Sequence, residues 1–343
     1  MPTKKPTKNR GSKLSHNARA VVTGAGSGIG RAFSLELARR GGEVICADIS
    51  LERAKETVAL IDEIGGTAHA VKCDVSIREQ VQDLALFAEL ELAGPLSLVI
   101  NNAGVGIGGK PVGEIGFDDW EWALGINLWG VVHGCEIFAP QLRASGAGGF
   151  INVASAAGFA AAPLMAPYNV GKAAVMSLSE TLSAELAGTG VRVTVLCPTF
   201  VKTNVALDGR ITAEATQLAQ ALMRRTGFSP ERIAVTTLDA YDKGRLYVVP
   251  QFDAKVIWRL KRYLRCIHVG LWSSQSLCTE TEVGIIWNFG GAGDELAEHE
   301  RSVTCPSIST ACCTRSRTAN GLWWTSTGML RAPRRSVQSF MRS

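Results

Sequence analysis

The sequence predicts an α/β protein built on a doubly wound parallel sheet of about seven strands, with helices on both faces. From residue 19 to about residue 249, short apolar runs typical of strands alternate with longer stretches whose apolar residues follow the helical period. The strand-like runs are residues 20–23, 43–47, 68–72, 96–100, 150–153, 192–196 and 246–249. Ligands bind at the carboxyl edge of such a sheet, so the residues that directly follow each strand are the candidate functional residues.

Composition places this chain among soluble cytoplasmic proteins. It has 343 residues, of which 46% are hydrophobic and 20% charged, and no apolar run is long enough to predict a membrane-spanning helix. Its nine cysteines show neither disulfide-framework nor zinc-site spacing, so we predict no metal site. Cys46, Cys73, Cys135 and Cys197 lie in apolar segments, which is typical of buried thiols in a reducing compartment.

Three segments flank the predicted α/β domain of residues 19–250. Residues 1–18 are basic and predict a disordered leader, with a targeting or anionic-surface role as the alternative. Residues 251–272 form a basic amphipathic stretch, for which docking on its own domain or on a partner subunit is favoured over contact with a membrane surface. Nothing in the basic residues resembles a nucleic-acid-binding module.

Residues 273–343 form an irregular tail that contains no lysine and follows neither the strand period nor the helix period for long. A loosely ordered extension is one interpretation. Translation in a shifted reading frame is the other, and the missing hydrophobic pattern favours it. We assign no chemistry to the tail under either interpretation.

A glycine-rich turn follows the first predicted strand and precedes a helix-like segment. It runs from Thr23 to Gly30, with glycine at positions 24, 26, 28 and 30. Such a turn lets the backbone approach a pyrophosphate, and the helix N-terminus offers N–H donors and a positive dipole end. A strand on one side and a helix on the other is the context that dinucleotide binding requires.

Carboxylates and amides follow the next three strands. Asp48 is placed to accept the adenosine ribose hydroxyls and to repel a 2′-phosphate, so NAD is favoured over NADP; a helix-capping role is the alternative. Asp74 suits the adenine amino group or, alternatively, caps the helix near Ser76. Asn101 and Asn102 either meet the ligand or join neighbouring strands.

Tyr168 and Lys172 stand four residues apart in a long helix-like segment, so their side chains share one face. A nearby ammonium would lower the pKa of the phenol and suit it to acid–base chemistry. Alone, such a pair usually marks a solvated helix face. Ser155 follows the fifth strand at the same sheet edge, where its hydroxyl would polarise a substrate oxygen. Asn127 falls within a helix-like stretch, where an asparagine suggests a role in function or in helix packing.

Together these residues resemble the compact branch of the short-chain dehydrogenase/reductase family. The matching motifs are Thr23-Gly24-x-x-x-Gly28-x-Gly30, Asp74, Asn101-Asn102-Ala103-Gly104, Asn127, Ser155 and Tyr168-x-x-x-Lys172. The resemblance implies a Rossmann-type sheet and a catalytic tetrad of Asn127, Ser155, Tyr168 and Lys172. It further implies cofactor contacts at Thr23, Gly24, Ser27, Gly28, Ile29, Gly30, Asp48, Asp74, Val75, Asn102, Ala103, Gly104, Tyr168, Lys172, Pro198, Val201 and Thr203.

The resemblance also implies a role for each member of the tetrad. Tyr168 exchanges a proton with the substrate oxygen that Ser155 orients. Lys172 holds the nicotinamide ribose and lowers the pKa of Tyr168, while Asn127 anchors a water in the proton relay. The chain departs from the family at Pro198-Thr199, where Pro-Gly is usual.

We therefore expect NAD-dependent interconversion of a secondary alcohol and its ketone, in a homodimer or homotetramer. The stretch from Ala156 to Met165 carries no charge, which favours a neutral, fairly apolar substrate. Two alternatives stay open: a catalytically idle dinucleotide-binding sensor or scaffold, and a frameshifted product with a compromised C-terminal end.

Overall fold

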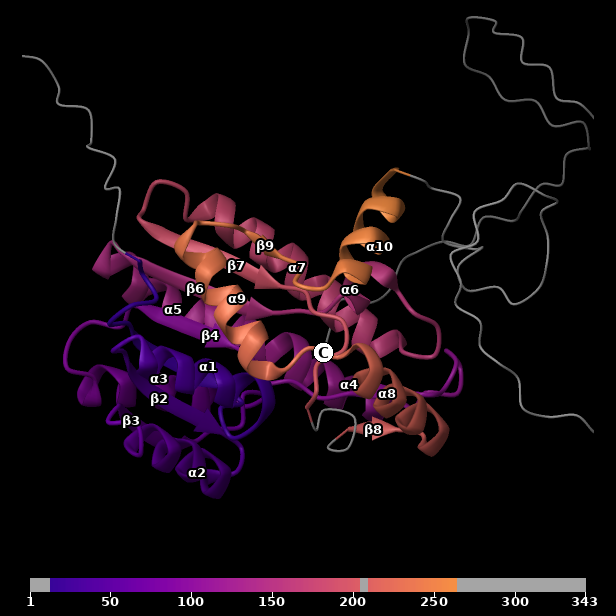
Figure 1. Cartoon of the computed structure of the whole chain (residues 1–343), viewed down its shortest axis with the longest axis horizontal. Helices are drawn as coiled ribbons and strands as arrows, with labels where there is room; N and C mark the ends of the chain where they lie inside the picture. The colour runs from indigo at the N-terminus through magenta and orange to yellow at the C-terminus, as the bar shows by residue number, and fades with distance from the viewer. Residues whose placement is uncertain (1–12, 204–208, 264–343) are drawn as a thin grey trace, which may run out of the picture. The chain divides into compact units, whose positions relative to one another are not determined.

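The computed structural model describes residues 13–203 and 209–263, and its centre is a seven-stranded parallel sheet (Figure 1). The strand order is β3-β2-β1-β4-β6-β7-β9, so the order reverses between β1 and β4. This arrangement confirms the predicted fold class. The strands are β1 (Arg19–Thr23), β2 (Glu43–Asp48), β3 (Thr67–Lys72), β4 (Leu98–Asn101), β6 (Gly148–Val153), β7 (Val191–Leu196) and β9 (Tyr247–Val248).

Helices cover both faces of the sheet, as the apolar strands require. On one face α3, α5 and α7 enclose a core that includes Val81, Phe138 and Leu182; on the other, α1 and α9 enclose a second core that includes Phe33 and Ile233. The helices are α1 (Gly28–Arg39), α2 (Leu51–Asp62), α3 (Arg78–Glu91), α4 (Phe117–Leu124), α5 (Gly130–Ser145), α6 (Ala157–Ala160), α7 (Ala166–Glu185), α8 (Ala213–Thr226), α9 (Pro230–Asp242) and α10 (Phe252–Tyr263).

Two further elements lie at the carboxyl edge of the sheet. A small parallel pair joins β5 (Ile107–Gly108) to β8 (Arg210–Ile211), so the segment after β4 meets the segment after β7. Between α4 and α5 the helix widens into a π-helical turn, η1 (Gly125–Trp129). Such turns inside helices are frequent at functional sites.

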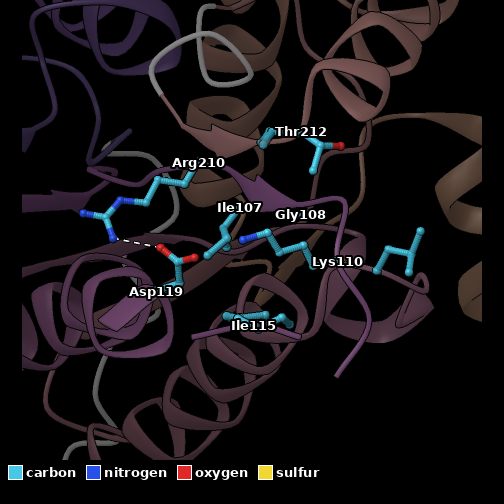
Figure 2. A pocket seen from close by; sticks show the side chains of 10 residues that line it. Ile107, Gly108, Lys110, Ile115, Asp119, Arg210 and Thr212 are labelled. Carbon is cyan, nitrogen blue, oxygen red and sulfur yellow. Dashed lines mark hydrogen bonds and ion pairs between the residues drawn. The ribbon is translucent and has the colours of Figure 1, made fainter. Parts of the chain in front are cut away.

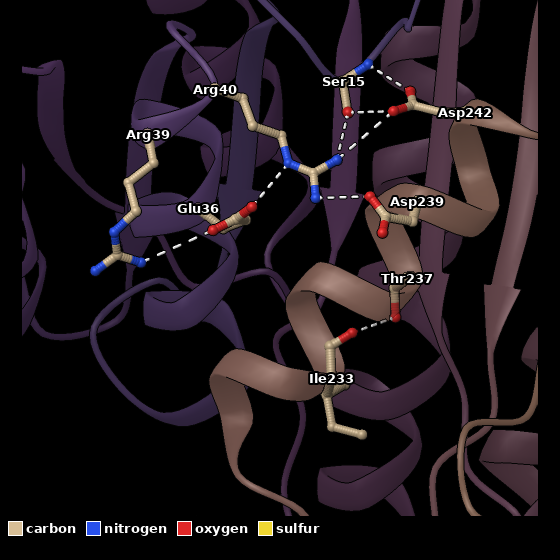
Figure 3. A network of polar contacts seen from close by, with 8 residues as sticks. All are labelled: Ser15, Glu36, Arg39, Arg40, Ile233, Thr237, Asp239 and Asp242. Atoms are coloured by element: carbon tan, nitrogen blue, oxygen red, sulfur yellow. Dashed lines mark hydrogen bonds and ion pairs between the residues drawn. The ribbon is translucent and has the colours of Figure 1, made fainter.

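The folded part of the chain begins before the predicted boundary at residue 19. Ser15 is buried and donates its N–H and hydroxyl to the Asp242 carboxylate at 2.8 and 2.7 Å. Arg40 donates to Ser15 at 2.9 Å and pairs with Glu36 and Asp239 at 2.8 and 2.9 Å (Figure 3). These contacts join the N-terminal segment, α1 and α9. Residues 1–12 of the predicted leader lie outside the described residues.

Residues 252–263 of the predicted amphipathic segment form α10, which packs on its own domain, and residues 264–272 lie outside the described residues. The Trp258 ring meets Phe159 and Tyr247, with centroid distances of 4.9 and 4.6 Å. Lys255 and Arg259 are exposed. Within residues 13–203 and 209–263, no helix is long and apolar enough to cross a membrane. The predicted tail, and both interpretations of it, lie outside the described residues.

Candidate active site

The glycine-rich turn forms a close-packed cradle between β1 and α1. Gly24 and Gly28 have positive φ angles of 64° and 53°, which glycine adopts without strain. A Cβ on Gly30 would lie 2.0 Å from the Gly24 carbonyl oxygen, and one on Gly24 would lie 2.8 Å from the Ala103 Cα. Larger residues therefore do not fit at these positions.

The cradle meets the chemical needs of a dinucleotide pyrophosphate. Ser27 is the N-cap of α1 but makes no side-chain capping hydrogen bond, and the first turn holds no acidic residue. No acidic side chain of the first turn of α1 therefore competes for its N–H groups, and the helix dipole favours an anion there. Ile29, also predicted as a cofactor contact, is half-buried in α1 and packs against the second core.

Asp48 lies beside the cradle, as the sequence predicts. Its carboxylate accepts the Gly26 N–H at 2.8 Å and the Ser50 N–H at 3.0 Å. The helix-capping alternative falls instead to Ser50, which is the N-cap of α2 and accepts the Arg53 N–H through its side chain. Asp48 therefore holds the glycine turn at the end of β2, and its contact with an adenosine ribose stays a prediction.

The other predicted adenine-side residues make mostly local contacts. Asp74 accepts the N–H and hydroxyl of Ser76 at 3.0 and 2.6 Å, which fits the capping alternative. Val75 is buried, and its carbonyl lies 2.9 Å from Nδ1 of His133 in α5. The adenine-contact role of Asp74 stays a prediction.

Asn102 joins β4 to β1, as the structural alternative proposed. Its Nδ2 donates to the carbonyls of Thr23 and Gly24 at 2.8 and 3.2 Å. In return the Thr23 hydroxyl accepts the N–H groups of Asn102 and Ala103 at 3.0 and 3.1 Å. These three predicted residues thus fix the shape of the cradle.

Asn127 lies in the π-helical turn η1 and is fully buried. Its Nδ2 donates to the Val105 carbonyl at 2.9 Å and its Oδ1 accepts the Val105 N–H at 3.0 Å. A Cβ on Gly104 would lie 2.8 Å from Asn127 Oδ1 and 3.2 Å from Lys172 Nζ. Gly104 therefore lets the amide and the ammonium approach the same stretch of backbone.

Ser155 is buried at the carboxyl end of β6, next to the turn that follows β7. Its hydroxyl donates to the Pro198 carbonyl at 3.3 Å and accepts the Ala157 N–H at 3.1 Å. Further along this turn, Val201 is buried and pairs with Phe228, and the methyl group of Thr203 lies beside Gly28. The turn thus connects Ser155 to the glycine cradle.

Tyr168 and Lys172 lie together in the first turns of α7, with Lys172 Nζ 5.8 Å from the centre of the phenol ring. Lys172 is 3% exposed and donates to the Val153 carbonyl at 2.9 Å. Burial lowers the pKa of Lys172 to about 8, while the nearby Cys197 acts in the opposite direction.

The pKa of Tyr168 is shifted in the direction opposite to the prediction. Burial of the phenol raises its pKa above the ordinary value, and a hydrogen bond with Ser155 only partly offsets that effect. Burial disfavours the phenolate, and Lys172, with a pKa of about 8, has lost its charge at the higher pH where the phenol would ionise.

A cavity of about 240 Å³ opens beside the N-terminus of α7 (Figure 2). Its apolar walls are Ile107, Ile115, Leu164, Pro167 and Ile211. On its polar side Arg210 pairs with Asp119 at 2.9 Å and stacks over the Trp122 ring at 4.3 Å, so the two opposite charges are matched. Pro167 directly precedes Tyr168 in α7, but Asn127, Ser155, Tyr168 and Lys172 do not themselves line this cavity.

Several residues that shape the site were not predicted. Buried Asn152 accepts from Asn101 at 2.9 Å and donates to Ser179 at 3.0 Å, which ties β4 and β6 to α7. Thr57 donates to the Ala25 carbonyl at 2.8 Å. Gln251 bonds to the turn after β7. Asn152 carried a signal, because a polar residue within a buried strand needs a partner.

Comparisons with known proteins identify the family to which this fold and site belong. The family model for short chain dehydrogenases matches residues 18–212. The oxidoreductase SadH of Mycobacterium tuberculosis is 35% identical over 250 residues, which cover 71% of this chain and 90% of that relative. A 3β-hydroxysteroid dehydrogenase of Mediterraneibacter gnavus is 37% identical over 179 residues, which cover 52% of this chain and 64% of that relative.

A solved structure leads to the same family. It is a short-chain dehydrogenase/reductase from Burkholderia phymatum in complex with NAD, 33% identical, with a TM-score of 0.70 over 79% of this chain and 100% of that one. Other similar solved structures include a complex with an NADP derivative. The chain therefore belongs to the short-chain dehydrogenase/reductase family, as an oxidoreductase with a nicotinamide dinucleotide cofactor.

Proposed function

We propose that this enzyme interconverts a neutral, fairly apolar secondary alcohol and its ketone, with NAD as cofactor and Tyr168 as the general acid and base. One observation carries the proposal. Asn127 and Lys172 converge on Gly104, Lys172 lies next to Tyr168, and Ser155 is close enough to Tyr168 to lower the pKa of the phenol, all at the sheet edge that holds the glycine cradle. A scaffold protein has no need of this combination.

Each side chain has a distinct task in the proposed reaction. The Ser155 hydroxyl orients the substrate oxygen, and the Tyr168 hydroxyl gives that oxygen a proton during ketone reduction or removes one during alcohol oxidation. Bound nicotinamide supplies the hydride exchange. Lys172 binds the nicotinamide ribose, and Asn127 holds the Val105 backbone beside it. A raised pKa keeps Tyr168 protonated at neutral pH, the form that ketone reduction requires.

NAD is proposed over NADP because the Asp48 carboxylate stands at the end of β2 beside the cradle, where it would repel a 2′-phosphate. Titration of the protein with each cofactor tests this choice. We expect NAD to bind at least about tenfold more tightly, which corresponds to about 1.4 kcal/mol. Tight NADP binding with weak NAD binding would overturn the assignment.

The substrate class is proposed from the walls of the site. The stretch from Ala156 to Met165 has no charge. The cavity near the start of α7 has mainly apolar walls, its Arg210 and Asp119 charges are paired, and Lys110 is the one further charged residue among the described residues that line it. The relative named as a 3β-hydroxysteroid dehydrogenase is consistent with a secondary alcohol on an apolar skeleton.

Turnover of a panel of neutral secondary alcohols and ketones, beside charged analogues, tests the substrate and the catalyst together. Tyr168→Phe should lower kcat by about 10²–10⁴-fold. Tyr247→Phe is the matched control, because its hydroxyl bonds to Glu180 at 2.5 Å in a different part of the chain. If Tyr168→Phe turns over as fast as the wild type, the catalytic assignment fails.

We also propose a homodimer or homotetramer in the cytoplasm. Exposed apolar side chains on neighbouring helices, Trp129 and Val170, support self-association. The cysteines of the described ranges, all buried thiols, suit a reducing compartment. Light scattering of the purified protein gives its mass, and a monomer at micromolar concentration would contradict the oligomer. If cell fractionation recovers the protein in the membrane fraction or among secreted proteins, the proposed cytoplasmic location is contradicted.

A further inference from the structure

The turn after β7 sets the position of two parts of the site at once. The Pro198 carbonyl accepts the Ser155 hydroxyl at 3.3 Å and the Ala156 N–H at 2.8 Å. Five residues later along the chain, Thr203 touches the cradle at Gly28. Thr199 stands within this turn, where the family usually has glycine, and its φ angle is not positive. The path of the turn therefore does not depend on glycine.

The side-chain amide of Gln251 makes two hydrogen bonds to the backbone of this turn. Gln251 lies three residues after the end of β9, is 2% exposed, and accepts the Thr199 N–H through Oε1 at 3.2 Å. Its Nε2 donates to the Phe200 carbonyl at 3.1 Å. Asp253 adds a third contact, since it accepts the Thr199 hydroxyl at 3.4 Å.

These contacts lie where strand pairing ends. The register of β7 and β9 stops at Leu196 and Val248, and Cys197 donates one further backbone hydrogen bond, to Val248 at 2.8 Å. Beyond that point the segments after β7 and β9 no longer pair as strands. The Gln251 amide there supplies the donor and the acceptor that a longer β9 would have supplied. A buried amide with both ends bonded favours one placement of its partners.

We propose that Gln251 is a positioning residue of the active site. It holds the N–H of the Pro198–Thr199 peptide and the carbonyl of the Phe200–Val201 peptide, so that the Pro198 carbonyl orients Ser155 and the turn reaches the bound cofactor. The inference rests on the proposed function, because it acts through the role given to Ser155. It extends the functional part of the chain beyond the predicted domain end at residue 250.

The test compares Gln251→Met with the wild type in the full chain. Met fills a similar volume without hydrogen bonds, so the turn loses both contacts. We expect the Kd for NAD, measured by calorimetry, to rise about tenfold. The pH profile of alcohol oxidation should move to higher pH, because a displaced Ser155 no longer lowers the pKa of Tyr168. A loss of stability alone would not move this profile.

Gln141→Met is the matched control, since the Gln141 amide donates to Glu89 on the surface at 2.7 Å, and its Kd and pH profile should equal those of the wild type. Gln251→Glu keeps the acceptor for Thr199 and loses the donor to Phe200. It should give an intermediate rise in Kd, and it carries the test if Gln251→Met does not fold.

A Gln251→Met protein, or in its absence Gln251→Glu, that binds NAD within about twofold of the wild type and keeps its pH profile would overturn the inference, even if its melting temperature falls. The proposed function is tested separately, by comparing the turnover of the wild type with that of Tyr168→Phe. Failure of that comparison is therefore distinct from failure of the Gln251 comparison.

Discussion

Replacing Lys172 by Met should stabilise the folded chain at neutral pH while abolishing turnover. The Lys172 ammonium is 3% exposed, and burial lowers its pKa from 10.5 to about 8. Each tenfold loss of proton affinity corresponds to about 1.4 kcal/mol, so holding this charge in the folded state below pH 8 costs about 3 kcal/mol. Methionine has a similar length and no charge, and it removes that cost.

The substitution also removes the hydrogen bond to the Val153 carbonyl, which offsets part of the gain by about 1–2 kcal/mol. The free energy of unfolding near pH 7 should therefore increase by about 1–2 kcal/mol, or about 3–6 °C in Tm for a domain of this size. Turnover should be lost, because the proposed site no longer holds the nicotinamide ribose.

The pH dependence gives the sharper test. The folded-state pKa of Lys172 lies below the unfolded value, so between about pH 8 and 10.5 the unfolded chain binds a proton that the folded chain has released. Wild-type stability from this group therefore rises with pH across that window. The advantage of Lys172→Met should shrink by about 3 kcal/mol on going from pH 7 to above pH 10.

Urea unfolding of both proteins near pH 7 and pH 10 measures this change. Lys55→Met, at an exposed position of α2, is the control and should show little difference from the wild type at either pH. A Lys172→Met protein that is less stable than the wild type near pH 7, or whose stability difference is the same at both pH values, would refute the reasoning.

Three further substitutions probe other contacts. Gly30→Ala places a Cβ 2.0 Å from the Gly24 carbonyl oxygen and should weaken NAD binding at least about tenfold by calorimetry; unchanged affinity would show that the cradle is adaptable. Arg40→Met should lower the free energy of unfolding by about 2–4 kcal/mol in urea, with NAD affinity unchanged, and an unaltered urea midpoint would contradict this. Gly134→Ala brings a Cβ to 2.0 Å from Asn101 Oδ1 and should cost about 1–3 kcal/mol, read as a lower Tm.

The features that the sequence predicted well depend on local pattern. The strands of the sheet are short apolar runs, and β1, β2, β3, β6 and β7 lie within about two residues of their predicted bounds. The glycine turn could be recognised from its spacing, and the structure gives the steric reason for it: Gly30 packs against the Gly24 carbonyl, and Gly24 packs against Ala103. The carboxyl-edge rule then predicted which strand-end residues would gather.

The features that the sequence did not predict depend on contacts between distant segments. Gln251 meets Thr199, and Ser15 meets Asp242, across long stretches of chain, and no periodicity encodes such pairs. The π-helical turn around Asn127 was predicted as ordinary helix, because one extra residue in a turn leaves the apolar spacing nearly unchanged. β9 is only two residues long, since Pro250 follows soon after and cannot donate to a ladder.

The Tyr168–Lys172 pair separates what spacing can predict from what it cannot. A separation of four residues predicts correctly that the two side chains meet, and Lys172 Nζ lies 5.8 Å from the phenol ring. The sign of the pKa shift depends instead on what surrounds both groups. Burial stabilises the neutral form of each, so the pKa of Lys172 falls to about 8 while that of Tyr168 rises. The attraction assumed from spacing needs a charged lysine while the phenol ionises. Because the pKa of Lys172 is about 8 and that of Tyr168 is raised, Lys172 releases its proton before Tyr168 does.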